Sequence, residues 1–478
     1  MTRNETSRQR GGETVSRHPM AKRPARPAVV RAKAGLRHAI ALAGMLTAKD
    51  VIRPSPVSGQ TASASVPVVT LAEARMRAAT VDPNAIAARN RIETAVSGRR
   101  AAVANLFTPN LRMGGSYTHF SDPFFNFGTG AISPNATSAT LDASYTVLGA
   151  GKFGDLKSSR ASVESALAGE TVARFRAALE TDAAYFGVLA ERELSRVAIE
   201  RVRRAEEQFG LARVRVLAGE AIASDSLQLL LELSRARLAI ITRDSAVVAS
   251  RLRLGRRIGL DGPAEAAPLD TAKPPPLPMS QEEAIAEMRR RGPDIEAARA
   301  DERSAKAMLS AEREQYLPEI AVGGTVGRYD SEFFPSALKR NQYAVTVSIP
   351  IWNAGERELA VARARADRNV ARATRADRER AAGELIAQAY HGYLTSSAGI
   401  DLALIGVAAA TENFRVQRAR YREGATTILD LLEAQVALSE AQATLIQTRY
   451  SVRLALAQIE SLLGRRIFEI PGTPTTVR

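Results

Sequence analysis

The chain carries the same long block twice. Residues 69–119 and residues 279–329 share their order of helical, turn-forming and alternating positions. Pro83 aligns with Pro293 and Gly114 with Gly323, at an offset of about 210 residues. A period of this length exceeds that of solenoid repeats and marks a duplicated half-protein. Whatever one half builds, the folded chain is therefore expected to build twice, as two interlocked halves of one body.

Several classes of function are excluded by composition and motif content. The 478 residues include no cysteine, which excludes disulfides, thiolate metal sites, cysteine nucleophiles and a lipid-anchored cysteine. The four histidines are scattered and none pairs at i, i+4. No phosphate-binding glycine loop and no nucleophile triad is present. The sequence therefore predicts a protein that is not an enzyme and that needs no metal and no cofactor.

The net charge of +15 first suggests a nucleic-acid binder. However, the first 60 residues hold twelve Lys/Arg against three acidic residues, and charges interleave along the rest of the chain. A short apolar run, residues 39–46, follows the basic stretch, and Ala62-Ser63-Ala64 offers a small-residue cleavage site. Residues 1–66 are thus predicted to be a targeting segment, with a disordered basic arm as the alternative, and no nucleic-acid partner is expected.

Each half reads as helix, two strands, long helix, turn and helix. Apolar and polar residues alternate in four segments of seven to ten residues. Alternation over about nine residues is the signature of strands and the length that a tilted strand needs to cross a bilayer. The segments are residues 111–120, 138–147, 320–326 and 343–349, with loops expected at residues 121–135 and 330–341. Fourteen of the twenty-four aromatic residues lie in residues 107–153 and 316–352. A membrane barrel with aromatic girdles explains this clustering, and ordinary hairpins tipped by aromatics are the alternative.

Most of the remaining chain is predicted to be helix of unusual length. Residues 153–213 and 356–422 contain no proline, and about 60 helical residues span roughly 90 Å. Helices this long must pack side by side, as in a coiled coil. A 3,4 seam of large and small residues supports this in the last helix, at Leu431, Ala434, Leu438, Ala441, Leu445, Thr448, Val452, Ala455, Ile459 and Leu462. No run of about 18 apolar residues is evident, so no helix is expected to span a bilayer.

The repeats and their junctions give the domain organisation. A first repeat is predicted over residues 67–261, a Pro-rich linker over 262–278, a second repeat over 279–470 and a tail over 471–478. Four strands cannot span a membrane alone, because open edges leave backbone groups unpaired in lipid. They must close with strands of other copies. Three chains supply about twelve strands, which can enclose a water-filled lumen.

Four motifs in this order resemble the TolC-type outer-membrane efflux proteins, across nearly all of residues 68–470. The motifs are the opener at residues 71–89 with its echo at 284–299, the junction Leu317-Pro318, the junction IPIWNAGER at 349–357, and the turn YREGATTILDLLEAQVAL at 421–438. The resemblance implies a mainly α protein with a small β part. Long antiparallel helical hairpins would form an α-barrel, and four strands per chain would join a trimeric 12-stranded transmembrane β-barrel.

The same resemblance implies a function, a location and partners. The chain would be a passive homotrimeric duct in the outer membrane of a Gram-negative-type bacterium, extending into the periplasm. It would serve a tripartite efflux or type I secretion system, together with a periplasmic adaptor protein and an inner-membrane pump, and export small molecules or polypeptides. The alternative is a soluble periplasmic coiled-coil scaffold, which would need neither lipid-length strands nor clustered aromatics.

The turns between the long helices are the candidate functional tips. The resemblance implies that the tube narrows there, with a gate formed by Asp225, Tyr421, Asp430 and Glu433, and with adaptor contacts at Gly219, Ser224, Gly424 and Thr426. Asp430 and Glu433 share a helix face, and rings of carboxylates favour cations. The family carries an Arg where this chain has Thr426, two residues after the tip glycine. The plain alternative is that Asp430 is an acidic residue favoured by the dipole at a helix start.

Overall fold

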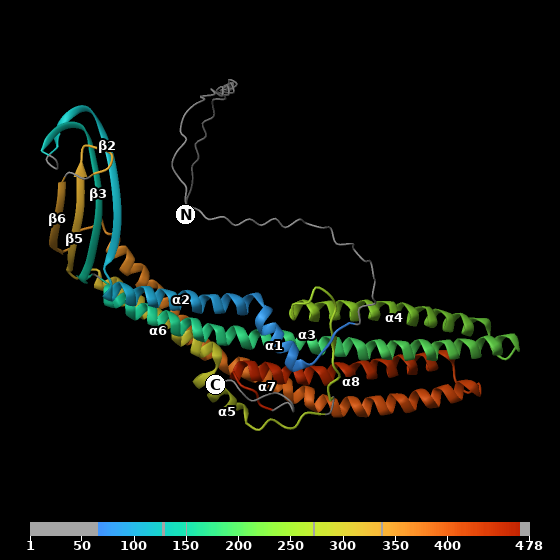
Figure 1. Cartoon of the computed structure of the whole chain (residues 1–478). Coiled ribbons are helices and arrows are strands. Elements are labelled where there is room, and N and C mark those ends of the chain that lie inside the picture. The colour runs from blue at the N-terminus through green and yellow to red at the C-terminus, as the bar shows by residue number, and fades with distance from the viewer. Residues whose placement is uncertain (1–65, 127–129, 150, 271–272, 336–337, 469–478) are drawn as a thin grey trace, which may run out of the picture. The chain divides into compact units, whose positions relative to one another are not determined.

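The structure, a computed structural model, describes residues 66–126, 130–149, 151–270, 273–335 and 338–468. The predicted tail, residues 471–478, and all but the last residue of the predicted targeting segment lie outside these ranges. The first half contains β1 (Val68–Val69), α1 (Leu71–Val81), α2 (Pro83–Phe107), β2 (Asn110–Asn126), β3 (Ala131–Leu148), α3 (Lys152–Leu217) and α4 (Ala223–Arg257). The second contains β4 (Glu265–Ala266), α5 (Gln281–Arg291), α6 (Pro293–Glu314), β5 (Glu319–Asp330), β6 (Leu338–Ser348), α7 (Glu356–Arg422) and α8 (Ile428–Leu463). The two halves share one element order (Figure 1), which confirms the duplication.

A proline divides the first predicted helix of each half at the same place. Pro83 begins α2 and Pro293 begins α6. Proline is tolerated at the first helical position because its missing N–H would be unpaired there in any case. The residue before each proline is not helical, with ψ of 125° at Asp82 and 135° at Gly292, as proline sterics require. Each half therefore opens with a bent pair of helices rather than one rod.

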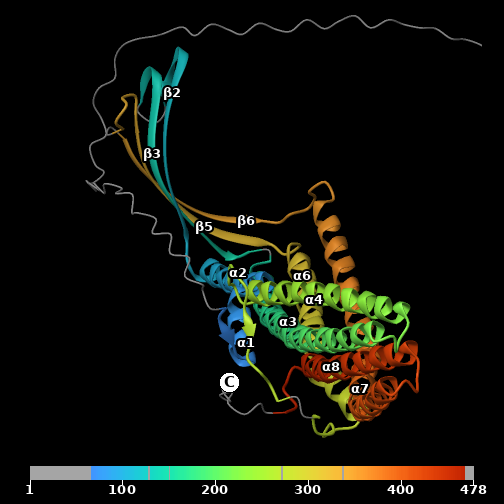
Figure 2. The same cartoon turned by 90° about the vertical axis from the view of Figure 1, so that its right-hand side faces the viewer.

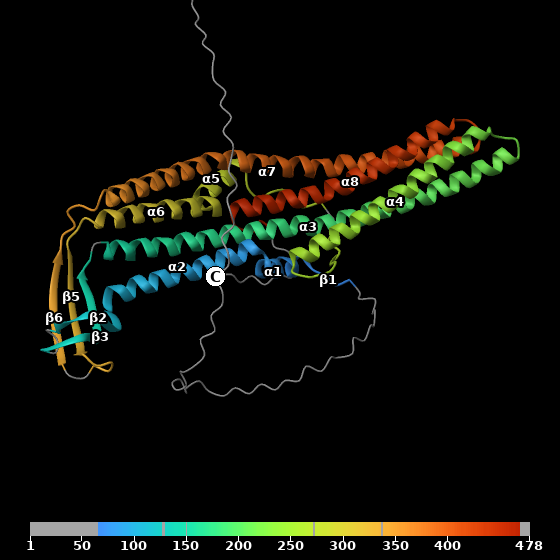
Figure 3. The ribbon, with the colours of Figure 1, turned by 90° about the horizontal axis from the view of Figure 1, so that it is seen from above.

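The helices lie side by side in single layers. Next to the sheet the order of packing is α2, α3, α6 and α7 (Figure 3). Toward the helical tips it is α4, α3, α8 and α7 (Figure 1). Helix α3 has 66 residues and α7 has 67. Each runs through both layers and is about 100 Å long. Within the described chain, α7 forms one edge along its whole length, and α2 and α4 form the other.

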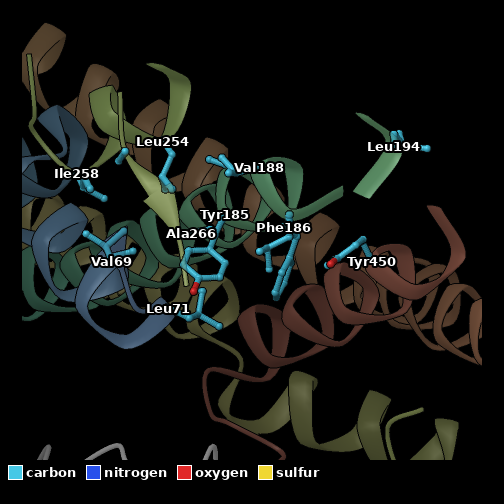
Figure 4. Packing of buried hydrophobic residues seen from close by; sticks show 14 of the residues in the cluster. Val69, Leu71, Tyr185, Phe186, Val188, Leu194, Leu254, Ile258, Ala266 and Tyr450 are labelled. Atoms are coloured by element: carbon cyan, nitrogen blue, oxygen red, sulfur yellow. The ribbon is translucent and has the colours of Figure 1, made fainter. Parts of the chain in front are cut away.

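The packing of α8 confirms the predicted seam. None of its ten seam residues is exposed, and six of them are buried. A second core forms where β1 and β4 pair beside α3 and α4, with Tyr185 and Phe186 at its centre (Figure 4). Tyr450 of α8 packs against Phe186 at its side. The Tyr185 hydroxyl donates a hydrogen bond to the Ala267 carbonyl oxygen, 2.8 Å away. This core fixes the middle of α3, from which the long hairpin extends to its tip.

The expectation that no helix is apolar enough to span a bilayer is wrong for α7. By length and composition alone, α7 contains an 18-residue stretch that could cross a membrane, with a mean hydropathy of 1.5. Only 6% of that stretch is buried. Large apolar residues such as Leu402 and Ile405 are 70% and 67% exposed in the single chain. The stretch therefore marks an uncovered apolar face on an edge helix.

The strands form one antiparallel sheet in the order β2-β3-β5-β6 (Figure 2). The predicted loop at residues 121–135 is wrong, because β2 continues to Asn126 and β3 begins at Ala131. A register shift between His119 and Phe124 absorbs the irregularity. Pro123 lies in this shifted stretch, where its missing N–H breaks no ladder bond. The second predicted loop, residues 330–341, is also shorter, since β6 begins at Leu338.

Candidate functional site

In the part of the sheet nearer the helices, the register sorts apolar and polar residues onto opposite faces; farther along, Arg328 and Lys339 lie on the otherwise apolar side. One rung of paired residues is apolar and consists of Leu111, Ala143, Gly324 and Tyr343. The next rung is polar and consists of Arg112, Asp142, Thr325 and Gln342. Successive residues of a strand point to opposite faces, so the two rungs face opposite ways. One side of the sheet is suited to lipid and the other to water.

Exposure and hydrogen bonding agree with this division. On the apolar face Met113 is 85% exposed and Tyr343 is 81% exposed, which is unusual for a protein whose surface meets only water. On the polar face the Asp142 carboxylate accepts hydrogen bonds from Thr325, 2.6 Å away, and Thr140, 3.1 Å away. Asp142, Thr140 and Thr325 are thus bonded to one another, while Met113 and Tyr343 have no covering layer in the single chain.

Exposed aromatic side chains lie near both ends of the strands. At the end where strands meet helices, each junction carries one, namely Phe107, Phe153, Tyr316 and Trp352, with exposures of 44–73%. At the far end Tyr117 and Phe333 are in contact, with ring centroids 5.8 Å apart. Between these ends β5 and β6 run for 12 and 11 residues. Such a pair of aromatic belts is typical of barrels that cross a bilayer.

The second helical tip is a well-capped turn. Gly424 adopts φ of 72°, a left-handed conformation that favours glycine. Thr427 and Asp430 form a reciprocal capping box at the start of α8. One oxygen of the Asp430 carboxylate accepts hydrogen bonds from the Thr427 and Thr426 hydroxyls, 2.6 and 2.8 Å away. These bonds lower the pKa of Asp430, so the carboxylate is ionised and holds the turn together.

The first tip is built differently. Gly219 adopts φ of 76°, but α4 begins after Ile222, which provides no side-chain cap. Ser224 is exposed, and Asp225 is half-buried in the first turn of α4. Glu433, on the second hairpin, is exposed one turn beyond Asp430. The four candidate gate residues thus lie at the two tips, but no hydrogen bond between described residues joins their side chains to one another.

Arg215, near the end of α3, connects the two tips. It donates a hydrogen bond to the Tyr421 carbonyl oxygen, 2.7 Å away, and its guanidinium lies 5.5 Å from the centre of the Tyr421 ring. Tyr421 is only 4% exposed, and its hydroxyl has no hydrogen-bond partner among the described residues. Burial, and then the Asp225 carboxylate, raise the pKa of Tyr421, so the phenol stays protonated.

Arg215 was not predicted as a site residue, although the sequence holds a signal for it. Both tips carry an Arg four residues before the tip glycine, Arg215 before Gly219 and Arg420 before Gly424. Arg420 donates to the Ala425 carbonyl of its own turn, 3.3 Å away, whereas Arg215 reaches the other hairpin. Among the described residues, no cluster of three or more His, Cys, Asp or Glu could hold a metal ion.

Comparison with known protein families identifies the family of this chain. A model of the family described as outer membrane efflux protein matches residues 69–260 and 284–465, well over half of the chain. The chain belongs to the outer membrane efflux protein family. Its members are channels rather than enzymes, and homology supports a duct for export in the outer membrane. No curated protein gives a significant match.

Solved structures of outer-membrane channels share the fold of this family member. The CmeC outer membrane channel of Campylobacter jejuni matches with a TM-score of 0.71 and 17% identity, covering 82% of this chain and 85% of that chain. CusC matches with a TM-score of 0.68 and 18% identity, covering 83% and 92%. VceC of Vibrio cholerae matches with a TM-score of 0.65 and 17% identity, covering 83% and 97%. The predicted fold class, mainly α with a small β part and TolC-type, is therefore confirmed.

Proposed function

We propose that three copies of this chain assemble into a passive export duct through the outer membrane. The observation that carries the proposal is the division of the sheet into an exposed apolar face and a hydrogen-bonded polar face. In a closed barrel the apolar face meets lipid and the polar face lines water. Four strands form only part of such a barrel, and closure with further copies removes the open edges that lipid does not tolerate.

The edges of the chain support a head-to-tail ring. Strand β6 and helix α7 form one edge, and β2, α2 and α4 form the other. Both edges expose large apolar residues, with Leu402 and Ile405 on α7 and Leu238 and Ile241 on α4. Two different edges that meet make a heterologous contact, which closes into a ring when the rotation allows. Three copies give twelve strands, enough for a lumen, whereas eight strands are filled by their own side chains.

The duct is proposed to work within a larger system that supplies the energy and chooses the cargo. A periplasmic adaptor would contact the tips at Gly219, Ser224, Gly424 and Thr426, and an inner-membrane pump would deliver small molecules or polypeptides. Helical hairpins recognise one another through grooves between packed helices. The glycines, with no side chain, allow a partner helix to approach closely.

The tips are proposed to form the gate, with Asp225, Tyr421, Asp430 and Glu433 as its residues. In three copies, Asp430 and Glu433 would supply six carboxylates near the end of the tube, a pattern that attracts cations. The capping role of Asp430 does not oppose this, because the residue is exposed as well as hydrogen-bonded. Arg215 joins this set as the contact between hairpins.

Planar bilayer recording tests the channel. The purified protein should migrate as a trimer in detergent and give discrete conductance steps, and a monomer that needs no detergent would instead support the scaffold alternative. Neutralising the tip with Asp430→Asn and Glu433→Gln should reduce cation selectivity. The control Glu200→Gln removes an exposed carboxylate from α3, away from the tip. If the reversal potential of the double variant is unchanged, neither Asp430 nor Glu433 lines the pore.

A further inference from the structure

A basic groove lies between α3 and α6, close to where both helices meet the sheet. Its volume is about 630 Å³, and its lining includes Phe153, Lys157, Arg160, Arg303 and Lys306. The one acidic side chain in the lining is Glu164, which pairs with Arg303 at 3.3 Å. The groove therefore keeps three positive charges that its own carboxylate does not balance.

These three cations are available to a ligand. Lys157, Arg160 and Lys306 are all exposed. Within the described parts of the chain, none of them forms an ion pair or a side-chain hydrogen bond. Cations gathered from two helices around one concave surface repel one another, and an anion bound between them relieves that repulsion. The arrangement points to a ligand with a phosphate or a similar oxyanion.

The position of the groove indicates where the anion comes from. Phe153, one of the aromatic residues at the strand–helix junctions, is 56% exposed and lines the groove. An exposed phenyl ring at this depth belongs on the lipid side rather than in a water-filled lumen. Lys157 lies five residues into α3 and Lys306 lies eight residues before the end of α6, roughly 8 and 12 Å below the belt. Long basic side chains at this depth reach the headgroup layer.

A second copy of the chain would not cover the groove. In the layer next to the sheet, α3 and α6 are the inner helices, flanked by α2 and α7 of the same chain. Copies that join through the edges therefore meet at α2 and α7 and leave the groove between α3 and α6 open.

We propose that this groove binds the phosphate of an anionic phospholipid in the leaflet that meets the helices. Lys157, Arg160 and Lys306 hold the phosphate, and Phe153 contacts the acyl chains at the belt. Basic pockets between helices at a membrane surface take lipid headgroups in this way. The bound lipid fixes the depth at which the barrel sits. This inference rests on the proposed channel function, because it requires the apolar face to lie in a bilayer.

The test is native mass spectrometry of the detergent-solubilised trimer titrated with phosphatidylglycerol. The variant Lys157→Gln, Arg160→Gln, Lys306→Gln removes the three cations. The control Arg213→Gln, Arg235→Gln, Arg253→Gln removes three exposed cations of the first helical hairpin that have no ion pair among the described residues. We expect each groove cation to contribute about fivefold to lipid affinity, so the groove variant should lose the tightest bound lipid and the control should keep it.

Three results would overturn the proposal. The groove variant could keep its lipid, or the control variant could lose as much, and either result would show that these cations do not hold the headgroup. Inorganic phosphate could displace the lipid completely at millimolar concentration, and the groove would then be a site for free anions. Conductance of the same samples separates the two proposals. If the wild-type trimer conducts but binds no more lipid than the groove variant, only the lipid site is refuted. If the protein neither trimerises nor conducts, the channel proposal itself is refuted.

Discussion

Replacing Arg215 with methionine should loosen the contact between the two helical hairpins. Methionine keeps an unbranched side chain but removes the charge and all donors. The lost contacts are the 2.7 Å hydrogen bond to the Tyr421 carbonyl and the stacking of the guanidinium 5.5 Å from the Tyr421 ring. The Arg215 side chain is only 17% exposed, so both contacts are largely shielded from water.

The size of the effect follows from these contacts. A hydrogen bond from a charged donor contributes about 1.5–3 kcal/mol, and the ion pair with the exposed Glu220, at 3.9 Å, adds little. If the loss of the Arg215 contacts costs about 2 kcal/mol per chain, the ratio of joined to parted hairpins falls roughly thirtyfold. If the hairpins of all three chains part together, about 6 kcal/mol is lost and the ratio of joined to parted hairpins falls by roughly 3 × 10⁴.

Single-channel recording in planar bilayers measures this change. The Arg215→Met channel should spend more time at high conductance than the wild type. Arg213→Met is the matched control, because Arg213 is exposed and has no hydrogen bond or ion pair among the described residues. Circular dichroism should show the same helix content for all three proteins, because the substitution removes one contact between hairpins and unfolds no helix. Equal conductance histograms for wild type, Arg215→Met and Arg213→Met would refute a role for Arg215 in holding the hairpins together.

Three further predictions concern the sheet and the second tip. Met113→Arg should destabilise the inserted barrel by about 2–4 kcal/mol, measured by urea unfolding in liposomes, while Ser116→Arg on the polar face should have little effect. Gly424→Ala should destabilise the turn by about 1–2 kcal/mol, because φ of 72° is unfavourable with a Cβ atom. The matched change Gly406→Ala lies inside α7 with open space around it and should not destabilise that helix. Hydrogen exchange at the tip compares the two variants. The lowered pKa of Asp430 means that its cap is present above the pKa of an unfolded aspartate and is lost as pH falls through the lowered value. Hydrogen exchange of residues 427–433 should accelerate over that range. Thr427→Val, which leaves the Thr426 hydroxyl bonded to Asp430, should weaken this pH dependence.

Local patterns predicted most of the elements. The alternation in residues 138–147 lies within β3, and the stretch 356–422 matches the bounds of α7. The prediction of a loop at residues 121–135 was wrong because pairing between strands overrides the local turn preference. The Gly, Pro and Asn residues of this segment favour turns locally, but pairing of Phe124 with Ser133 and of Phe125 with Ile132 extends the hairpin beyond them. Cross-strand contacts of this kind are not visible in a single segment.

The candidate site was less predictable than the fold. Tyr421 and Asp430 were chosen through the family resemblance, and their role in a gate stays a prediction. The domain boundaries at residues 67–261 and 279–470 likewise stay predictions. Arg215 was missed because Arg215 and Arg420 occupy equivalent positions in the two repeats. Sequence alone cannot tell which of the two reaches across, since this depends on how the hairpins pack side by side.

The unequal tips suggest which hairpin moves. The second tip is closed by its own capping box, so its shape does not depend on the first hairpin. The first tip has no side-chain cap on α4. It is joined to the second tip by the hydrogen bond from Arg215 to the Tyr421 carbonyl oxygen. Breaking the Arg215 contact would therefore release the α3–α4 hairpin while the α7–α8 turn keeps its form. An adaptor helix that binds near Gly424 would compete with Arg215 for this position, because a Cβ atom at residue 424 would already lie 3.6 Å from the Arg215 guanidinium. Binding of the partner and release of the first hairpin would then be one event.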